Sequence, residues 1–358
     1  MVNKNVYAVV MAGGIGSRFW PASREKTPKQ FLDILGTGET LLQATCSRFE
    51  KICPKENIFV VTNLKYKELV KEQVPGLHDQ QILLEPIGRN TAPCIAYAAF
   101  KIASKDPESV MIVAPSDHAV FNLKKFNEVI DLAINQATAG DKLITLGIRP
   151  HRPETGYGYI QFIEGDKKVN KVKTFTEKPS LQMAVKFLES GDFVWNSGMF
   201  IWQTNSIVFA FEKYLPDLVE IFDEAHGAYY TDREEAAIKF VYSQCKSISI
   251  DYGVMEKANN VYVVPAEFGW SDIGSWNALH EISDKDENNN RLDGNVLVFD
   301  VKNSFISGPK DKLIVASELD GYLIAEYDNA LLICKKDDEN SFRKIFAEVK
   351  KKKGEQYL

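Results

Sequence analysis

The chain has 358 residues, of which 45% are hydrophobic and 26% are charged, and its formal net charge is -6. This composition excludes a collagen, a coiled coil and a disordered chain, and the length predicts one domain of roughly 250 residues beside a smaller one. The 43 basic residues are outnumbered by 49 acidic ones, which argues against nucleic acid or a membrane surface as a partner.

The cysteines and the apolar runs limit the compartment in which we expect the protein. Five cysteines lie far apart without a CxxC pair, so neither a disulfide framework nor a zinc knuckle is indicated. The apolar run 6–12 is too short for the core of a signal peptide, and no later run approaches the ~18 residues of a membrane span. We therefore expect a cytoplasmic protein.

The first 150 residues alternate short apolar strands with amphipathic stretches. Residues 6–12 are continuously apolar and end at Gly13 and Gly14, which is typical of a strand buried on both faces. Further elements are predicted as strands at 57–62, 81–84 and 110–114 and as a helix at 91–104. This alternation predicts a Rossmann-like α/β domain with a mixed, mainly parallel sheet, whose ligands gather beyond the carboxyl ends of the strands.

Beyond residue 150 the pattern becomes mixed, and we assign it to the second half of the same domain. The predicted strands are 158–163, 171–175, 198–202 and 261–264, and the predicted helices are 181–189 and 206–214. The polar, turn-prone stretch 284–290 is the best candidate boundary. After it, β runs at 295–301, 313–316, 322–326 and 330–334 precede a helix at 342–353. The sequence thus predicts a domain over 1–285 and a small β-rich domain over 286–358.

Three glycines, Gly13, Gly14 and Gly16, follow the first strand, where a loop that cradles phosphate commonly lies. A Walker A loop is excluded because its Gly-Lys pair is missing, and Phe19 stands where a dinucleotide fingerprint needs a small residue. A plain tight turn is the alternative. If the loop binds phosphate, a β-branched residue at position 14 or 16 should block nucleotide binding and leave the fold intact.

A series of motifs continues from this loop. In chain order they are RFWPASREKTPKQF (18–31), EPIGRNTAP (85–93), PSDH (115–118), ETGYGYI (154–160), EKP (177–179), WNSGMF (195–200) and SDIGSW (271–276). The series resembles the motifs of sugar-1-phosphate nucleotidylyltransferases, and its FWP and PKQF words resemble the mannose-1-phosphate guanylyltransferase branch. The resemblance spans about residues 6–335.

The resemblance implies an enzyme that transfers GMP from GTP to α-D-mannose 1-phosphate, which gives GDP-mannose and pyrophosphate. Two anions must be brought together for attack at the α-phosphorus, so catalysis depends on positioning and charge neutralisation. Arg18 and Lys29 are the expected catalytic residues, with solvated surface charges as the alternative. The expected nucleotide-binding residues are Ala12, Gly13, Gly14, Gly16, Ser17, Glu85, Arg89, Asn90, Ser116 and Asp117.

The family likeness also implies a magnesium site and a sugar phosphate site. Asp117 and Asp272 each follow a predicted strand, and two converging carboxylates suit Mg²⁺, which keeps the rest of its shell for phosphates and water. The alternative is that each aspartate caps its own turn. The expected residues for the sugar phosphate are Gly156, Glu177, Lys178 and Asn196. For Glu177 and Lys178 the alternative is an exposed turn before a helix.

The β-rich C-terminal stretch resembles the abbreviated left-handed β-helix of the family, which implies a homodimer. Three other interpretations stay open. The enzyme could use another sugar 1-phosphate such as a heptose, since few hydroxyl contacts decide that choice. A catalytically silent regulatory subunit that senses nucleotide sugars is the second, although the presence of Arg18, Lys29, Asp117 and Asp272 counts against it. A nicotinamide dehydrogenase is the third, disfavoured by Phe19.

Overall fold

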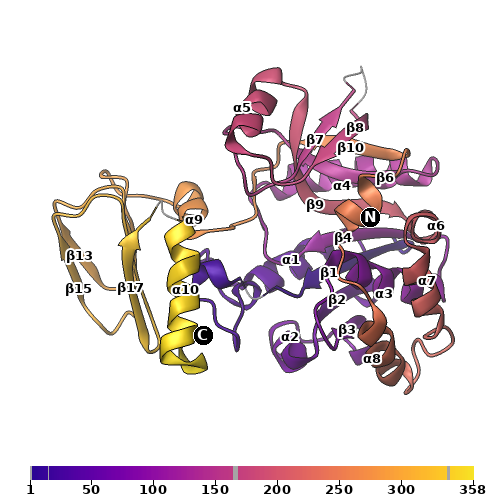
Figure 1. The fold of residues 1–358 in the computed structure, drawn as a ribbon, viewed down its shortest axis with the longest axis horizontal. Helices are drawn as coiled ribbons and strands as arrows, with labels where there is room; N and C mark the ends of the chain where they lie inside the picture. Colours follow the sequence, from indigo (N-terminus) through magenta and orange to yellow (C-terminus); the bar gives the residue numbers. More distant parts are fainter. Residues whose placement is uncertain (1, 15, 164–167, 337–338) are drawn as a thin grey trace. The chain divides into compact units, whose positions relative to one another are not determined.

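The computed structural model describes residues 2–14, 16–163, 168–336 and 339–358, and its contacts divide the chain into two compact units (Figure 1). The larger unit comprises Met1–Gly13, Gln43–Ser116 and Val120–Trp270. The smaller unit comprises Gly14–Leu42, Asp117–Ala119 and Ser271–Leu358. Within the residues that the structure describes, no helix has the length and apolar character needed to cross a membrane.

A nine-stranded sheet forms the centre of the larger unit, in the order β3-β2-β1-β4-β9-β6-β10-β8-β7. The neighbours β3, β2, β1 and β4 are parallel, as are β6 and β10, whereas β9 is antiparallel to both β4 and β6. Its strands are β1 (Val6–Ala12), β2 (Ile58–Asn63), β3 (Ile82–Glu85), β4 (Val110–Pro115), β6 (Leu143–Ile148), β7 (Tyr159–Phe162), β8 (Asn170–Thr176), β9 (Phe193–Gln203) and β10 (Val261–Ala266).

Helices pack against this sheet because their apolar faces share one core with the strands. The core includes Val9 of β1, Phe200 and Trp202 of β9, and Ile95 of α3, each at most 1% exposed. The helices of this unit are α2 (Lys67–Gln73), α3 (Thr91–Ala103), α4 (Leu123–Thr138), α5 (Leu181–Ser190), α6 (Thr204–Tyr214), α7 (Pro216–Asp223) and α8 (Glu234–Gln244), and α1 (Leu41–Phe49) runs into it from the smaller unit. The α/β architecture predicted from the sequence is confirmed. The expectation that the sheet is mainly parallel is wrong, because β8 is antiparallel to β10 and β7, and β9 is antiparallel to β4, β6 and β7.

The smaller unit combines an N-terminal segment with the C-terminal β-rich region. Strands β12 (Arg291–Asp293), β14 (Phe305–Ser307), β16 (Tyr322–Tyr327) and β17 (Ala330–Lys335) form one sheet, and β13 (Val296–Phe299) and β15 (Ile314–Ser317) form another. All these pairs are parallel except β16 with β17. The helices are α9 (Trp276–Ile282) and α10 (Glu339–Lys353), and the short strands β5 (Ala119–Val120) and β11 (Trp270–Ser271) pair where the chain passes between the units.

The sequence-based boundary after residue 285 differs from this division. Phe19 and Trp20 share a core with Trp276, Phe305 and Phe342, so residues on both sides of position 285 belong to one hydrophobic cluster. Trp276 makes this clear, since its ring lies 5.1 Å from that of Phe19 and 5.1 Å from that of Phe305. The functional division into a nucleotidyltransferase domain over 1–285 and a domain over 286–358 stays a prediction.

Candidate active site

Gly14 and Gly16 of the glycine loop belong to the smaller unit, and they differ in what they require. Gly16 has φ +68°, and a Cβ atom there would lie 2.5 Å from Cβ of Lys29, so the position needs glycine for the fold itself. Gly14 has no heavy atom within 4 Å of such a Cβ, and its carbonyl accepts a hydrogen bond of 2.9 Å from Nε2 of Gln30. The expectation that a β-branched residue at position 16 leaves the fold intact is therefore wrong, and Gly14 is the position that can test ligand approach.

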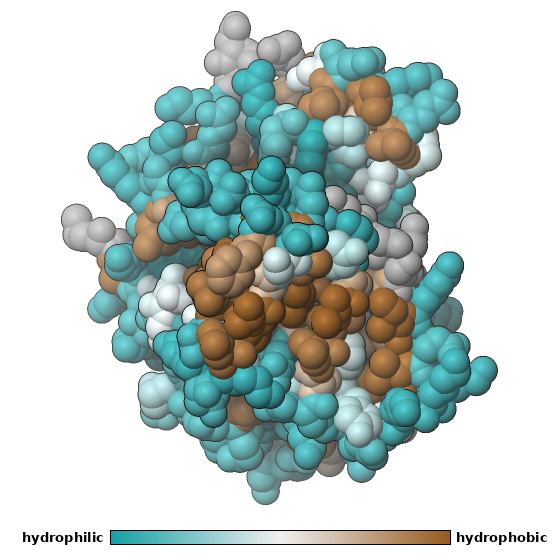
Figure 2. Space-filling model, turned by 90° about the vertical axis from the view of Figure 1, so that its left-hand side faces the viewer, coloured by the Kyte–Doolittle hydropathy of each residue, from teal (hydrophilic) through white to brown (hydrophobic). Residues whose placement is uncertain are grey.

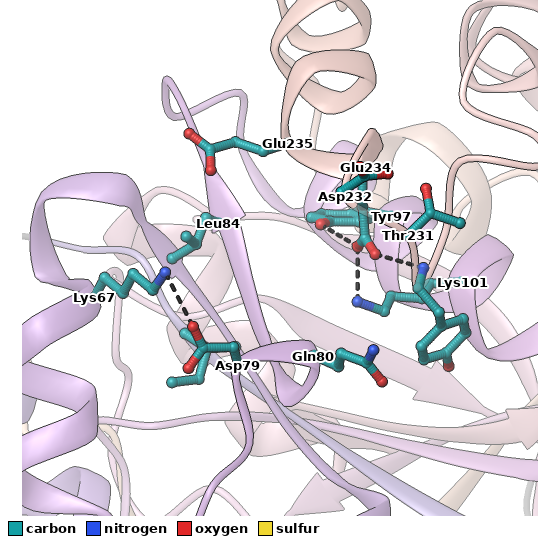
Figure 3. A pocket seen from close by; sticks show the side chains of 12 residues that line it. Lys67, Asp79, Gln80, Leu84, Tyr97, Lys101, Thr231, Asp232, Glu234 and Glu235 are labelled. Atoms are coloured by element: carbon teal, nitrogen blue, oxygen red, sulfur yellow. Dashed lines mark hydrogen bonds and ion pairs between the residues drawn. The ribbon is translucent and has the colours of Figure 1, made fainter.

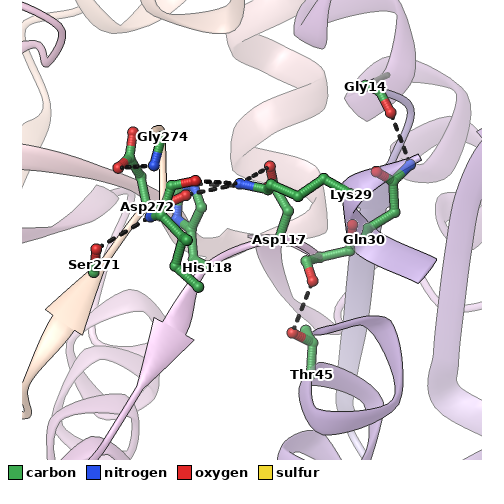
Figure 4. Close-up of polar contacts among 11 residues, drawn as sticks. Gly14, Lys29, Gln30, Thr45, Asp117, His118, Ser271, Asp272 and Gly274 are labelled. Carbon is green, nitrogen blue, oxygen red and sulfur yellow. Dashed lines mark hydrogen bonds and ion pairs between the residues drawn. The ribbon is translucent and has the colours of Figure 1, made fainter. Parts of the chain in front are cut away.

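Lys29 lies in a short 3₁₀ turn of the smaller unit and is 3% exposed, which contradicts its interpretation as a surface charge. Its Nζ lies 2.8 Å from Oδ2 of Asp117 and donates to the backbone carbonyls of Asp272 at 2.9 Å and Ile273 at 3.0 Å (Figure 4). An ammonium has three N–H donors, and these three oxygens account for all of them. The structure thus brings Lys29, Asp117 and Asp272 together around one positive charge.

Asp117 is ionised in this setting. Desolvation opposes ionisation, but the Lys29 ammonium and His118, whose Nε2 lies 3.8 Å from Oδ1 of Asp117, hold the pKa of the Asp117 carboxyl below its ordinary value. Its side chain is 36% exposed, so a ligand can reach it without opening the core. Asp117 therefore presents a negative charge that a metal or a cationic side chain can bind.

The Asp272 turn is tightly constrained. Oδ1 of Asp272 accepts from the backbone N–H of Gly274 at 2.8 Å, and Oγ of Ser271 accepts from that of Ile273 at 3.1 Å. Ile273 has φ +43°, which is costly for a β-branched residue and persists because the side chain is fully buried. The carboxylate thus caps its own turn, as the alternative interpretation holds, and the same turn directs two carbonyls at Lys29.

The remaining candidates of the smaller unit are open to solvent. Arg18 and Ser17 are exposed on the 3₁₀ turn Ser17–Phe19, and Arg18 forms no ion pair with any residue in the described part of the chain. Among those described residues, no cluster of three or more His, Cys, Asp or Glu side chains could hold a metal ion. A divalent ion here would depend on two aspartates, backbone carbonyls, water and phosphate.

In the larger unit, candidate nucleotide-binding residues lie at the carboxyl ends of neighbouring strands. Ala12 is the last residue of β1 and Gly13 follows it, Glu85 ends β3, and Ser116 follows β4. The N–H of Ser116 donates to the carbonyl of Met11 at 2.9 Å, which ties the end of β4 to β1. This placement agrees with the expectation that ligands gather at this edge of the sheet.

Glu85 is buried, and its environment perturbs its ionisation. The hydroxyl of Tyr242 donates to Oε1 of Glu85 at 3.0 Å, while burial raises the pKa of the Glu85 carboxyl to about 7. Arg89 donates to the carbonyl of Tyr242 at 3.3 Å, and the side chain of Asn90 caps α3 by accepting from the N–H of Thr91. Tyr242 thus connects two candidates. It belongs to α8, and no motif in the sequence marked it.

The candidate sugar phosphate residues form a second cluster in the larger unit. Oε2 of Glu177 would lie 2.5 Å from a Cβ atom at Gly158, so this glycine lets the carboxylate approach the backbone. Nδ2 of Asn196 donates to Oδ1 of Asp251 at 2.7 Å. Burial, followed by repulsion from Glu177, raises the pKa of Asp251 to about 6. Sequence reasoning missed Asp251, which lies in the π-helical turn Asp251–Met255 and is marked by no motif in the sequence.

Lys178 and Gly156 make local contacts beside this cluster. Nζ of Lys178 pairs with Oε1 of Glu177 at 2.9 Å, and Lys178 is exposed. The N–H of Gly156 donates to Oε1 of Glu154 at 2.8 Å, and the same carboxylate pairs with Arg152 at 3.0 Å. Trp195, which begins the WNSGMF motif, is buried.

A separate pocket of about 350 Å³ lies in the larger unit and contains none of the predicted site residues (Figure 3). On its wall, Nζ of Lys101 pairs with Oε1 of Glu234 at 2.7 Å, and the Tyr97 hydroxyl donates to the same oxygen at 2.6 Å. The N–H of Tyr230 donates to Oε2 of Glu234 at 2.7 Å. Glu234 thus pairs with three neighbouring groups on this wall.

The α/β sheet, with candidate anion-binding groups at the carboxyl ends of its strands, is typical of a nucleotide-binding enzyme. Residues 7–289 match the model of the nucleotidyl transferase family, and the chain belongs to that family.

Relatives share nearly the whole chain. A mannose-1-phosphate guanylyltransferase from Klebsiella pneumoniae is 36% identical over 98% of this chain and 75% of the relative. Xanthan biosynthesis protein XanB from Xanthomonas campestris pv. campestris (strain B100) is 36% identical over 97% of this chain and 73% of the relative. The crystal structure of a mannose-1-phosphate geranyltransferase from Thermus thermophilus superposes with a TM-score of 0.86 and 32% identity, over 97% of this chain and 99% of the other.

Proposed function

We propose that this chain is a mannose-1-phosphate guanylyltransferase, which transfers GMP from GTP to α-D-mannose 1-phosphate and releases pyrophosphate. The observation that carries the proposal is the 36% identity, over 98% of the chain, to a relative of that name. The cluster of Lys29, Asp117 and Asp272 supports it, because a reaction between two anions needs charges that are held in place near the phosphates. A cytoplasmic location belongs to the proposal, since neither phosphorylated substrate crosses a membrane unaided.

In this proposal the glycine loop and Arg18 bind the triphosphate. Gly14 is exposed and leaves space beside the backbone, and Arg18 is exposed with a guanidinium suited to two phosphate oxygens. Ala12, Gly13, Ser17 and Ser116 contribute backbone to the nucleotide site. Glu85, Arg89 and Asn90 shape the part that receives the base.

Mg²⁺ is the proposed cofactor, held by Asp117 and Asp272. The donor set fits a hard cation, since a carboxylate and two carbonyls already surround one positive charge. When bound, the ion would neutralise phosphate charge. Asp117 and the Asp272 turn would fix its position, and Lys29 supplies a further positive charge for the leaving pyrophosphate.

Glu177, Asn196 and Lys178 are the proposed ligands of mannose 1-phosphate, together with the backbone at Gly156. Carboxylate and amide groups pair with sugar hydroxyls, whereas Lys178 suits the phosphate. The Glu177 side chain offers oxygen acceptors, so it selects the hydroxyl positions of the sugar that point at it.

A pyrophosphate-release assay over a matrix of nucleoside triphosphates and sugar 1-phosphates tests the function. We expect the highest kcat/KM with GTP and mannose 1-phosphate, and a loss of turnover when the divalent metal is chelated. A preference for a heptose 1-phosphate would replace mannose as the substrate. Absence of metal-dependent turnover with every pair would overturn the enzymatic proposal in favour of a regulatory subunit.

The proposal includes a homodimer, built through the β-rich region of the smaller unit. β12 pairs in parallel with β14, β14 with β16, and β13 with β15, so each of these strands pairs with the strand two further along the chain. This alternation supports an abbreviated left-handed β-helix. One face of this region is apolar (Figure 2). Its side chains, each 48–58% exposed, are Leu297, Phe299, Leu313, Val315, Leu331 and Ile333. A second copy of this apolar face is the proposed partner.

A further inference from the structure

Lys29 is bound in the way that proteins bind a metal cation. Its Nζ has one carboxylate oxygen, from Asp117, and two backbone carbonyl oxygens, from Asp272 and Ile273, at 2.8, 2.9 and 3.0 Å. Carboxylate and carbonyl oxygens are also the donors that hard divalent ions prefer. A lysine that is 3% exposed and uses all three N–H donors has no donor left for a phosphate.

The oxygen cluster is held by its own turn as well as by Lys29. Asp272 and Ser271 fix the turn through bonds to the N–H groups of Gly274 and Ile273. A Cβ atom at Gly274 would lie 2.7 Å from Oδ2 of Asp272, so this turn also requires a glycine. Because Ile273 has a left-handed backbone conformation, the carbonyls of Asp272 and Ile273 both point toward Nζ of Lys29. The turn therefore presents a preformed set of oxygens to whichever cation lies between it and Asp117.

We propose that the Lys29 ammonium occupies the position of a divalent cation in the nucleotide-free chain, and that the metal bound with nucleotide displaces it. The inference rests on the proposed function for the identity of the nucleotide. Exchange keeps Asp117 compensated at every stage, because one cation replaces another. It also frees the three donors of Lys29 at the moment when a triphosphate is present to receive them. One residue thus has two successive roles, as a placeholder and as a phosphate ligand.

The test measures Mn²⁺ binding to the nucleotide-free protein by electron paramagnetic resonance, with Mg²⁺ as competitor. In the wild type the ammonium should compete with the metal. In Lys29→Met, which keeps an unbranched side chain, ends one atom short of Nζ and removes the charge, Mn²⁺ should bind at least tenfold more tightly. Adding Asp117→Asn to Lys29→Met should abolish that gain, because the carboxylate is the shared ligand.

Lys101→Met is a matched control. Lys101 is 2% exposed and pairs with Glu234 at 2.7 Å, so Lys101→Met loses an ion pair of the same kind. Lys101 belongs to the larger unit, whereas the Asp272 turn belongs to the smaller one. We expect millimolar Mg²⁺ to restore thermal stability to Lys29→Met and not to Lys101→Met. If Lys29→Met folds poorly, Lys29→Gln keeps hydrogen bonding without charge and serves the same comparison.

Equal or weaker Mn²⁺ affinity in a folded Lys29 variant would overturn the exchange. That result is distinguishable from failure of the proposed function, because metal binding is measured without turnover. An active guanylyltransferase could fail this test, and an inactive chain could pass it.

Discussion

Asn196 donates to Asp251 through Nδ2 at 2.7 Å, and its Oδ1 accepts from the Thr145 hydroxyl and from the N–H of Gly198, both at 3.2 Å. These three bonds assign one orientation to the amide, so its second N–H is directed by Asp251. Asp251 is therefore a positioning residue, since it orients the amide of Asn196 and is not itself proposed to bind the ligand.

Asp251→Ala should raise the KM for mannose 1-phosphate about tenfold with little change in kcat, because the orphaned Asn196 amide would lose its orientation. Asp251→Asn keeps an oxygen acceptor and should largely rescue KM at pH 7. In the wild type, Asp251 takes up a proton as the pH falls through about 6 and ceases to repel the phosphate. Because the phosphate of mannose 1-phosphate titrates equally in both assays, the ratio of mutant to wild-type KM reports only on the protein. A ratio that does not vary with pH in Asp251→Asn would contradict this role.

Glu85→Gln tests the buried carboxyl at the end of β3. The folded pKa of Glu85, about 7, lies above its ordinary value, so the folded state retains a proton that the unfolded state releases. Stability from this group is therefore present below pH 4.5 and is lost as the pH rises to about 7. Glu85→Gln removes that loss. Its free energy of unfolding at pH 8 should exceed that of the wild type by up to about 3 kcal/mol, because each unit of pKa shift corresponds to about 1.4 kcal/mol.

Urea unfolding of wild type and Glu85→Gln at pH 5 and pH 8 measures this effect. The gain should be smaller at pH 5, where the wild-type carboxyl is already protonated in the folded state. A loss of stability at both pH values would mean that the Tyr242 contact needs a carboxylate. GTP affinity measured on the same variant reports separately on the proposed base site.

Gly14→Val and Gly16→Val should fail in different ways. At position 14 the new side chain has open space around it, so the protein should fold normally and bind GTP at least tenfold more weakly if phosphate approaches that backbone. At position 16 the change meets Lys29 and a positive φ, so the melting temperature should fall by several degrees. Isothermal titration calorimetry and thermal melts separate the two. Normal GTP affinity in Gly14→Val would remove the loop from the nucleotide site.

Arg18→Ala should lower kcat about 100-fold, the scale for loss of one preorganised group that stabilises charge. Because Arg18 is exposed, circular dichroism and the melting temperature should not change. Arg149→Ala is the matched control, since Arg149 is an exposed arginine with a side chain 82% accessible. Equal kcat in both variants would mean that Arg18 is a solvated surface charge without a catalytic role.

Phe299→Asp should dissociate the proposed dimer. Phe299 is 53% exposed on the apolar face. In the variant, each subunit would bury an aspartate charge at the two-fold interface, opposite the same charge of the other subunit. Light scattering at micromolar concentration should give a dimer for the wild type and a monomer of 40.4 kDa for the variant. Phe240→Asp, at a 54% exposed position of α8, should leave the mass unchanged. A monomeric wild type would refute the dimer.

The strands that are continuously apolar were the part of the fold that the sequence revealed most directly. β1 has its predicted bounds, β2 and β3 lie one residue later than predicted, and β4 begins as predicted and ends one residue later. The agreement is close because buried parallel strands are continuously apolar. β6 was not predicted, although its LITLGI run is fully buried and is followed by Pro150 and Pro153, which are typical turn residues. Helices α4 and α8 were missed since their polar faces obscure a narrow apolar stripe.

For the candidate site, motifs located the residues and the structure supplied their partners. Lys29 was expected near phosphate, yet its burial and its carbonyl ligands depend on a turn 243 residues further along the chain. Asp251 and Tyr242 gain their importance from contacts with Asn196 and Glu85, which no local pattern encodes. Residue type and spacing reveal chemistry, whereas pairing across the chain requires coordinates.

The shared core of the smaller unit has a consequence for synthesis of the protein. Phe19 and Trp20 emerge from the ribosome early, but the side chains that cover them, such as Phe305 and Phe342, emerge about 300 residues later. The sheet of the larger unit can assemble in the interval, while this aromatic pair stays uncovered and open to aggregation or to a chaperone. A ribosome stalled after residue 300 should therefore carry a nascent chain in which segment 14–42 is still digestible by protease.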